Sequence, residues 1–266
     1  MIVFPNAKIN IGLQVLNKRA DNYHELETVF YPVKLFDVLE IIEAPTVSFH
    51  PSGISIEGAL DQNICLKAYN LLVQDFDLPP VEIYLHKVIP VGAGLGGGSS
   101  DAAYMIKALN DKFQLNLTKE NMQSYARKLG ADCAFFIQNQ PVFAQGIGDE
   151  FTDIKLDLST YHFVIVKPKI HISTVEAYQV IVPDSHGKKL KLNIQTPIEV
   201  WKNTVINDFE AGIFRKFPEI RKIKEEMYNL GAIYASMSGS GSAVYGIFRE
   251  KLLFPEYEGK YDVFYC

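Results

Sequence analysis

A run of glycines and serines at residues 90–103 is the part of this sequence best suited to chemistry. It reads PVGAGLGGGSSDAA, and it lies between a strand-like alternation and a helical pattern. Glycines adopt positive φ angles, so several backbone N–H groups can converge on one anion, and the following helix adds unpaired N–H groups at its start. The segment therefore predicts a phosphate-binding loop. Its predicted phosphate contacts are Pro90, Gly92, Gly94, Leu95, Gly96, Gly97, Gly98, Ser99 and Ser100.

Two familiar phosphate-binding patterns do not describe this loop. No lysine follows its last glycine, so it is not a P-loop. Gly92, Gly94 and Gly97 match GxGxxG, but no strand–helix–strand unit with an acidic residue about 20 positions later is evident. A plain turn packed against a sheet is the alternative, and the strand–loop–helix context argues against it.

A loop of this kind needs a cation from elsewhere, because phosphoryl transfer depends on positioning and on stabilising negative charge. Lys8 is a candidate, since it interrupts an otherwise apolar stretch at residues 8–16. Asp132 follows Gly130 and precedes the apolar run Ala134, Phe135, Phe136 and Ile137, which predicts that its carboxylate lies at the end of a buried element. Taken alone, the two residues also fit an exposed strand lysine and an ordinary turn aspartate.

The elements that must position these residues alternate between strands and helices. Strands are predicted at 8–16, 28–33, 38–42, 81–85, 141–151, 161–167, 232–237, 243–248 and 261–265, and helices at 63–76, 100–110, 118–130, 174–181, 196–216 and 218–230. A short hairpin is predicted at 47–57 and an exposed turn at 186–189. Polar sequence at 152–160 predicts two domains, residues 1–155 and 156–266. This mixture predicts an α+β fold rather than a doubly wound parallel sheet.

Composition restricts the class of protein. The chain has 266 residues, of which 48% are hydrophobic, and a formal net charge of -5, which argues against nucleic-acid binding. Cys65, Cys133 and Cys266 match no metal or redox spacing, so they are expected to be thiols in a reducing compartment. No window approaches the roughly 20 apolar residues that span a bilayer, and no leader is evident. We therefore expect a soluble, cytoplasmic protein without a membrane partner, and the oligomeric state stays open.

Three motifs together resemble the GHMP kinase superfamily, named for galactokinase, homoserine kinase, mevalonate kinase and phosphomevalonate kinase. They are NAKINIGL at 6–13, the glycine-rich loop, and MSGSGSAVYGIF at 237–248. The resemblance implies a two-domain fold, with an N-terminal ribosomal protein S5 domain 2-like part and a C-terminal ferredoxin-like part. It also implies ATP with Mg²⁺ as phosphate donor and an active site between the domains.

Further segments narrow this resemblance to one group of members. They are RADNYHELETVF at 19–30, GADCAFF at 130–136 and NDFE at 207–210. They resemble the members that phosphorylate the 2-hydroxyl of a cytidine diphosphate-linked methylerythritol, in the non-mevalonate route to isoprenoid precursors. The implied partner is thus a small-molecule substrate.

The resemblance also implies a role for each matched residue. Lys8 and Asp132 correspond to the catalytic lysine and aspartate. The implied substrate contacts are Asn10, Tyr23, His24, Thr174 and Tyr178. Among them, Tyr23, His24 and Tyr178 are expected to hold the cytosine ring. Period-two alternation independently puts Asn10 on the same strand face as Lys8.

Three smaller interpretations accompany these roles. Gly239, Ser240 and Gly241 either support the phosphate loop and line the substrate cleft or form a tight turn. Asn63 either caps the helix that follows it or lies near adenine, and N-cap statistics favour the cap. Alternative functions are a kinase of the same family acting on homoserine or mevalonate, and a non-catalytic nucleotide-binding protein. The residues at 23–24 argue against the first, and retention of both Lys8 and Asp132 argues against the second.

Overall fold

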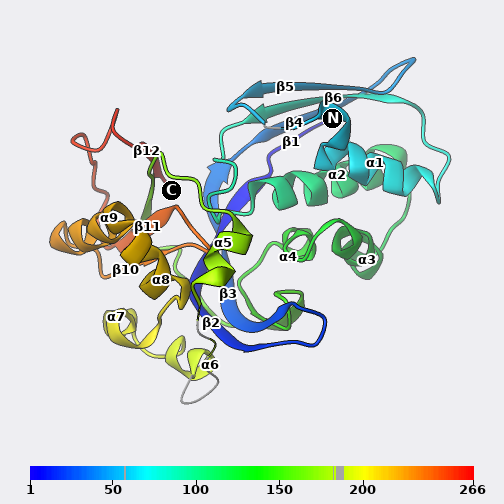
Figure 1. Cartoon of the computed structure of the whole chain (residues 1–266). Coiled ribbons are helices and arrows are strands. Elements are labelled where there is room, and N and C mark those ends of the chain that lie inside the picture. Colours follow the sequence, from blue (N-terminus) through cyan, green and yellow to red (C-terminus); the bar gives the residue numbers. More distant parts are fainter. Residues whose placement is uncertain (57, 182, 184–188) are drawn as a thin grey trace. The chain divides into compact units, whose positions relative to one another are not determined.

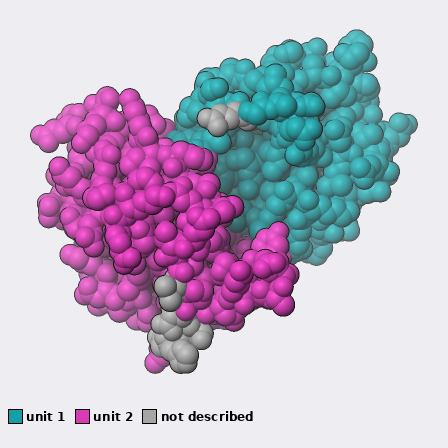
Figure 2. Space-filling model, viewed as in Figure 1, with its two compact units in different colours: residues 1–7, 34–91, 96–140 teal, residues 8–33, 92–95, 141–266 magenta. Residues whose placement is uncertain are grey.

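The protein is divided into two compact units, which Figure 2 colours separately. The computed structural model describes residues 1–56, 58–181, 183 and 189–266. Unit 1 contains residues 1–7, 34–91 and 96–140, and unit 2 contains residues 8–33, 92–95 and 141–266. These units are defined by contacts and not by domain limits, so the predicted boundary at residues 155 and 156 stays a prediction. Of the turn predicted at 186–189, residues 186–188 lie outside the described residues.

Unit 1 is a sheet with helices beside it (Figure 1). The strand order is β1 (Ile2–Val3), β4 (Val38–Glu43), β6 (Val81–Lys87) and β5 (Ser48–Gly53). The helical elements are η1 (Leu60–Gln62), α1 (Ile64–Val73), α2 (Gly97–Phe113), α3 (Lys119–Leu129) and α4 (Cys133–Gln138). Helix α2 packs on β1 and β4 as well as on the other three α-helices of the unit. The helix that begins in the glycine-rich loop is therefore the central element of unit 1.

Capping residues set the starts of two helices in unit 1, as the sequence predicts. The Asn63 side chain accepts a hydrogen bond from the Cys65 backbone N–H at 2.9 Å, which confirms its capping role. Thr118 begins α3 through a reciprocal capping box with Asn121, and Gly130 ends the helix.

Unit 2 contains two sheets. The first has the order β2 (Asn6–Lys18), β3 (His24–Phe36), β7 (Val142–Gln145) and β8 (Glu150–Asp153), with β2 entering the unit at Lys8 and β3 leaving it after Val33. The second is antiparallel, with the order β10 (Tyr234–Met237), β11 (Val244–Phe248), β9 (His162–Lys167) and β12 (Asp262–Tyr265). Both units thus combine helices with sheets, which confirms the α+β class.

Unit 2 also contains several helices, some of which pack on its second sheet. They are α5 (Thr174–Gln179), α6 (Leu190–Asn193), η2 (Ile198–Val200), α7 (Trp201–Thr204), α8 (Phe209–Lys216) and α9 (Pro218–Asn229). Helix α9 packs on β10 and β11 (Figure 1). Its buried Ile220, Ile223 and Met227 join Val244 and Phe248 in one apolar core. Among the described residues, no helix has the length and apolar character needed to cross a membrane.

The hairpin predicted at 47–57 is wrong. Pro51, Ser52 and Gly53 lie within β5, which pairs in parallel with β6 over Leu85, His86 and Lys87. A proline is tolerated there because β5 is an edge strand, where one side of the backbone needs no ladder partner. The turn-forming residues are therefore part of a strand because tertiary pairing overrides local preference.

Two further predicted elements are interrupted. The strand predicted at 141–151 is the hairpin of β7 and β8, which pair antiparallel. The helix predicted at 196–216 is broken between α7 and α8. In that break the Leu13 N–H donates to the Ile206 carbonyl at 3.0 Å, and the Asp208 N–H donates to the Leu13 carbonyl at 2.8 Å. Pairing with β2 thus replaces helical hydrogen bonds in this segment.

Candidate active site

Strand β2 brings Lys8 and Asn10 together, as period-two alternation predicts. The Lys8 ammonium donates to Asn10 Oδ1 at 2.6 Å, and both side chains are buried. Asn10 Nδ2 donates to Thr28 Oγ1 at 3.0 Å, which fixes the orientation of the amide. Lys8 Nζ also lies 4.7 Å from the centroid of the Phe30 ring. This buried ammonium is therefore held in one direction rather than left as a mobile surface charge.

The middle of the glycine-rich loop, residues 92–95, packs against this strand and against the third motif. The Lys8 N–H donates to the Leu95 carbonyl at 2.9 Å. Ser238 Oγ donates to the Gly94 carbonyl at 2.8 Å and accepts from the Asn10 N–H at 3.2 Å. A Cβ atom on Gly94 would lie 2.0 Å from the Ser238 carbonyl oxygen, so only glycine fits this close approach. Sequence reasoning placed the third motif near the loop but did not single out Ser238.

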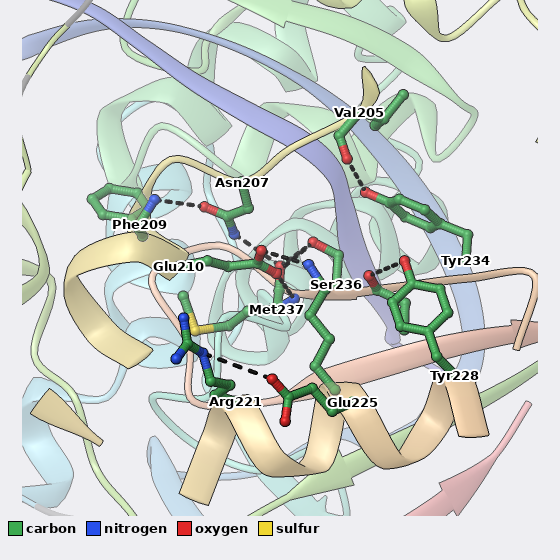
Figure 3. Close-up of polar contacts among 12 residues, drawn as sticks. Val205, Asn207, Phe209, Glu210, Arg221, Glu225, Tyr228, Tyr234, Ser236 and Met237 are labelled. Atoms are coloured by element: carbon green, nitrogen blue, oxygen red, sulfur yellow. Dashed lines mark hydrogen bonds and ion pairs between the residues drawn. The ribbon is translucent and has the colours of Figure 1, made fainter. Parts of the chain in front are cut away.

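The NDFE segment holds the third motif in place (Figure 3). Asn207 Nδ2 donates to the carbonyls of Met237 and Gly239, both at 2.8 Å, and its Oδ1 accepts from the Phe209 N–H at 3.0 Å. Glu210 accepts from the Met237 N–H at 2.9 Å and from Ser236 Oγ at 3.1 Å. Every hydrogen-bonding atom of the buried Asn207 amide is thus used to fix backbone.

The end of the loop forms the start of α2 in unit 1. Gly96 occupies the N-cap position with a left-handed backbone, φ 69°, and Gly97, Gly98, Ser99 and Ser100 form the first turn. Ser100 is buried, and its Oγ has no hydrogen-bond partner among the described residues. Unpaired N–H groups at the start of a 17-residue helix suit an anion. Pro90, the first residue of the loop, is buried in the same unit.

Asp132 occupies the N-cap position of α4 in unit 1. The helix behind it buries Phe135 and Phe136 completely or nearly so, at 1% and 0% exposure. The polar carboxylate therefore stands at the end of an apolar element. This short helix was not predicted from the sequence.

Aromatic residues of unit 2 lie close together at the start of β3. The rings of His24 and Tyr178 stack with centroids 4.5 Å apart, and Tyr178 meets Phe209 edge-on at 4.9 Å. Burial lowers the pKa of His24, and nearby Lys18 lowers it further. A neutral imidazole both donates and accepts hydrogen bonds, as the edge of a nucleobase requires. Tyr23 is 60% exposed beside this pair, and Thr174, which begins α5, is also exposed.

Unit 1 contains a buried charge cluster that sequence reasoning missed, consisting of Asp37, Lys87 and Asp101. Lys87 Nζ donates to Asp101 Oδ2 at 2.8 Å and also to Asp37 Oδ2. Asp37 Oδ1 accepts from the backbone N–H groups of Val88 at 2.6 Å and Ile89 at 2.9 Å. The only signal for this cluster in the sequence was the place of Lys87 in β6. Side chains of this strand alternate between its two faces, and Lys87 falls on the buried face at the end of the strand.

Comparison with known proteins identifies the family. Residues 63–146 match the model of the GHMP kinases N terminal domain, and residues 199–253 match that of the GHMP kinases C terminal domain. The chain belongs to the GHMP kinase family.

Several individual proteins are similar to this chain over nearly its whole length. A protein of Bacteroides thetaiotaomicron named 4-diphosphocytidyl-2-C-methyl-D-erythritol kinase is 52% identical over 268 residues, covering 99% of this chain and 98% of its own. A crystal structure of 4-(cytidine 5'-diphospho)-2C-methyl-D-erythritol kinase superposes with a TM-score of 0.80 at 32% identity, covering 93% of this chain and 90% of its own. A mevalonate kinase of Methanococcus jannaschii shares the fold, with a TM-score of 0.72 at 15% identity and coverage of 100% of this chain and 97% of its own.

Replacing Gly94 with alanine is expected to lower the free energy of unfolding by at least about 2 kcal/mol. The residue has φ +78°, which strains an L residue, and the new Cβ atom would meet the Ser238 carbonyl. Gly231→Ala is the matched control, because Gly231 has φ +95° with nothing within 4 Å and carries only backbone strain. Urea unfolding measures both. Equal losses would contradict a contribution from the close approach of Gly94 to Ser238.

Asp101 is expected to make stability depend on pH. Burial raises the pKa of its carboxyl group to about 8, against the opposing effect of Lys87 and with a smaller contribution from Asp37. Because this pKa exceeds that of an unfolded aspartate, the folded protein retains the proton. The free energy of unfolding therefore falls as pH rises from about 4 to about 8, by at most about 1.4 kcal/mol per pH unit.

Asp101→Asn keeps the size of the side chain and does not titrate. The difference in unfolding free energy between the wild-type protein and this variant should therefore shrink or reverse in sign as pH rises toward 8. Urea unfolding at several pH values between about 5 and 9 measures this difference. A difference that is constant with pH would contradict the raised pKa.

Proposed function

We propose that this protein transfers the γ-phosphoryl group of ATP to the 2-hydroxyl of 4-diphosphocytidyl-2-C-methyl-D-erythritol, in the non-mevalonate route to isoprenoid precursors. The observation that carries the proposal is similarity along nearly the whole chain, at about half identity, to a protein named as that kinase. The buried Lys8 ammonium, which donates a hydrogen bond of 2.6 Å to Asn10 Oδ1, supplies the positive charge that such a transfer needs. Retention of Asp132 as well disfavours a non-catalytic protein.

The glycine-rich loop would hold the triphosphate. Backbone N–H groups at the start of α2 face an anion favourably, and the glycines leave room for its close approach. Lys8 would stabilise charge on the transferred phosphoryl group and orient the acceptor hydroxyl. Asp132 would receive the hydroxyl proton or steer it towards phosphate, and a dissociative transfer demands little proton abstraction.

Magnesium would accompany the triphosphate. Among the described residues, no group of three or more His, Cys, Asp or Glu side chains is arranged to hold a metal ion. Mg²⁺ usually keeps several waters and binds substrate phosphates with few protein ligands, and the buried Ser100 Oγ at the start of α2, which has no hydrogen-bond partner among the described residues, would offer an oxygen to the ion or to one of its waters. When bound, the ion neutralises charge on the phosphate oxygens.

The aromatic group of unit 2 would bind the cytosine ring. The His24 and Tyr178 rings lie 4.5 Å apart, too close for a third ring between them, so cytosine would stack on one outer face or separate the two. Asn10, Tyr23 and Thr174 would complete the substrate contacts.

Cys65, Cys133 and Cys266, all described, form no disulfide, and a reducing cytoplasm is the proposed location.

Removing either charged group should disable the enzyme. Lys8→Ala and Asp132→Ala are each expected to lower kcat with the cytidyl substrate by at least about 100-fold, the scale of single electrostatic or acid–base groups. Lys34→Ala on β3 and Asp111→Ala on α2 are matched controls, because both residues are exposed. Steady-state assays of ADP release measure all four. Near-normal rates in both site variants would contradict the mechanism.

The cytidyl group should decide which acceptor reacts. We expect turnover of 4-diphosphocytidyl-2-C-methyl-D-erythritol and no measurable turnover of mevalonate or homoserine, since neither offers a nucleobase to the aromatic group. Phosphorus NMR of the product locates the new phosphate on the 2-hydroxyl. Turnover of mevalonate without turnover of the cytidyl substrate would replace the proposed acceptor.

A further inference from the structure

The buried charge cluster lies directly beneath the first turn of α2. Asp101 belongs to this helix, Lys87 is the last residue of β6, and Asp37 lies between β3 and β4. A Cβ atom built on Gly97, the first residue of α2, would lie 3.1 Å from Lys87 Nζ. The ammonium group is therefore packed against the start of the helix and also bonded to its fifth residue.

Hydrogen bonding makes Lys87 the connection between this helix and the sheet. Asp101 Oδ2 receives the Lys87 ammonium at 2.8 Å, while Asp101 Oδ1 is buried without a hydrogen-bond partner among the described residues. Asp37 is bound in turn to the backbone of residues 88–89. An ion pair and two backbone bonds thus join α2 to the segment that leads into the phosphate-binding loop.

The charges of the cluster have a consequence for an anion above it. The Asp37 carboxylate beneath a helix N-terminus would by itself oppose the favourable field of that terminus for phosphate, and Asp101 would add to this once it loses its proton above its pKa of about 8. The ammonium of Lys87 offsets this negative charge because all three groups are at most 3% exposed and little screened by water. The same group that anchors the helix therefore also protects its affinity for an anion.

We propose that Lys87, with Asp101, is a positioning residue for the phosphate donor, fixing the first turn of α2 and cancelling negative charge beneath it. This inference rests on the proposed function, because it concerns how the loop binds ATP. Lys87 touches no reacting atom in this proposal; it acts through Asp101 and the helix. A purely structural ion cluster would instead stabilise unit 1, and its loss would not weaken the binding of ATP more than the binding of the cytidyl acceptor.

Three cluster variants separate these roles. Asp101→Ala removes the anchor and leaves the balanced Lys87–Asp37 pair, so it should fold; Asp101→Asn restores an oxygen acceptor of the same size. Lys87→Met removes the ammonium and leaves the buried Asp37 carboxylate without its cation beside the Asp101 carboxyl group, which can prevent folding. Tyr69→Phe is the control, since it deletes a hydrogen bond to the Pro79 carbonyl, 3.1 Å long, on α1, which packs on α2.

Calorimetric titration gives the affinity for a non-hydrolysable ATP analogue with Mg²⁺ and, separately, for the cytidyl acceptor. We expect Asp101→Ala, and Lys87→Met where it folds, to raise the Kd for the analogue about tenfold or more, with the acceptor Kd changed less than about twofold. Asp101→Asn should restore analogue binding to within about threefold of wild type at pH 7. Tyr69→Phe should leave both affinities unchanged, and circular dichroism checks that each variant is folded.

Several outcomes would overturn the inference. One is unchanged binding of the ATP analogue by folded Asp101→Ala, and another is equal weakening of analogue binding and acceptor binding. A third is a rise in the analogue Kd of Tyr69→Phe equal to that of Asp101→Ala. The last is failure of every cluster variant to fold, which would make the cluster a requirement of the fold alone. A wild-type protein that does not bind the analogue would instead overturn the proposed function. The two failures are therefore distinguishable.

Discussion

A buried ammonium group must be surrounded by oxygen acceptors, and this requirement governs both units of the protein. Lys8 and Lys87 are each 3% exposed. Water no longer solvates them, so their stability depends on partners held at the right distance. Lys8 has a neutral amide oxygen two residues away on the same strand, whereas Lys87 lies between two carboxylates from different elements. Both ammonium groups are thus held in a fixed direction, one by an amide on its own strand and the other by carboxyl groups from two other elements.

The glycine-rich loop is determined as much by what packs against it as by its own glycines. A glycine such as Gly94 is flexible in isolation. Here its conformation is fixed by the neighbouring strand and by the carbonyl and hydroxyl groups of Ser238. Asn207 fixes the backbone on either side of Ser238. An amide suits this task because it offers two donors and an acceptor in one plane without introducing charge. The family motifs thus interact physically even where they lie far apart in sequence.

Local signals in the sequence predicted local structure well. The start of α3 follows from Thr118 and its end from Gly130, and the Lys8–Asn10 pair follows from the period of a strand. The signals were insufficient where a distant partner decides the outcome. Pro51 lies in a strand because β6 pairs with it, and the helix predicted at 196–216 is broken because β2 binds its middle. The Asp37–Lys87 contact, 50 positions apart, leaves no periodic trace in the sequence.

The attachment of the 205–208 segment to β2 has a consequence for synthesis on the ribosome. Val15 is hydrogen-bonded to the Asp208 carboxylate, 193 positions further along the chain. Unit 1 is complete once residue 140 has emerged, whereas unit 2 joins residues 8–33 to 141–266. The nascent strand bearing Lys8 can pair with β3 early, but it must remain without its neighbours at residues 205–208 through most of translation. Such long sequence separations slow folding and expose apolar surface, so this is the stage at which a holding chaperone has most to protect.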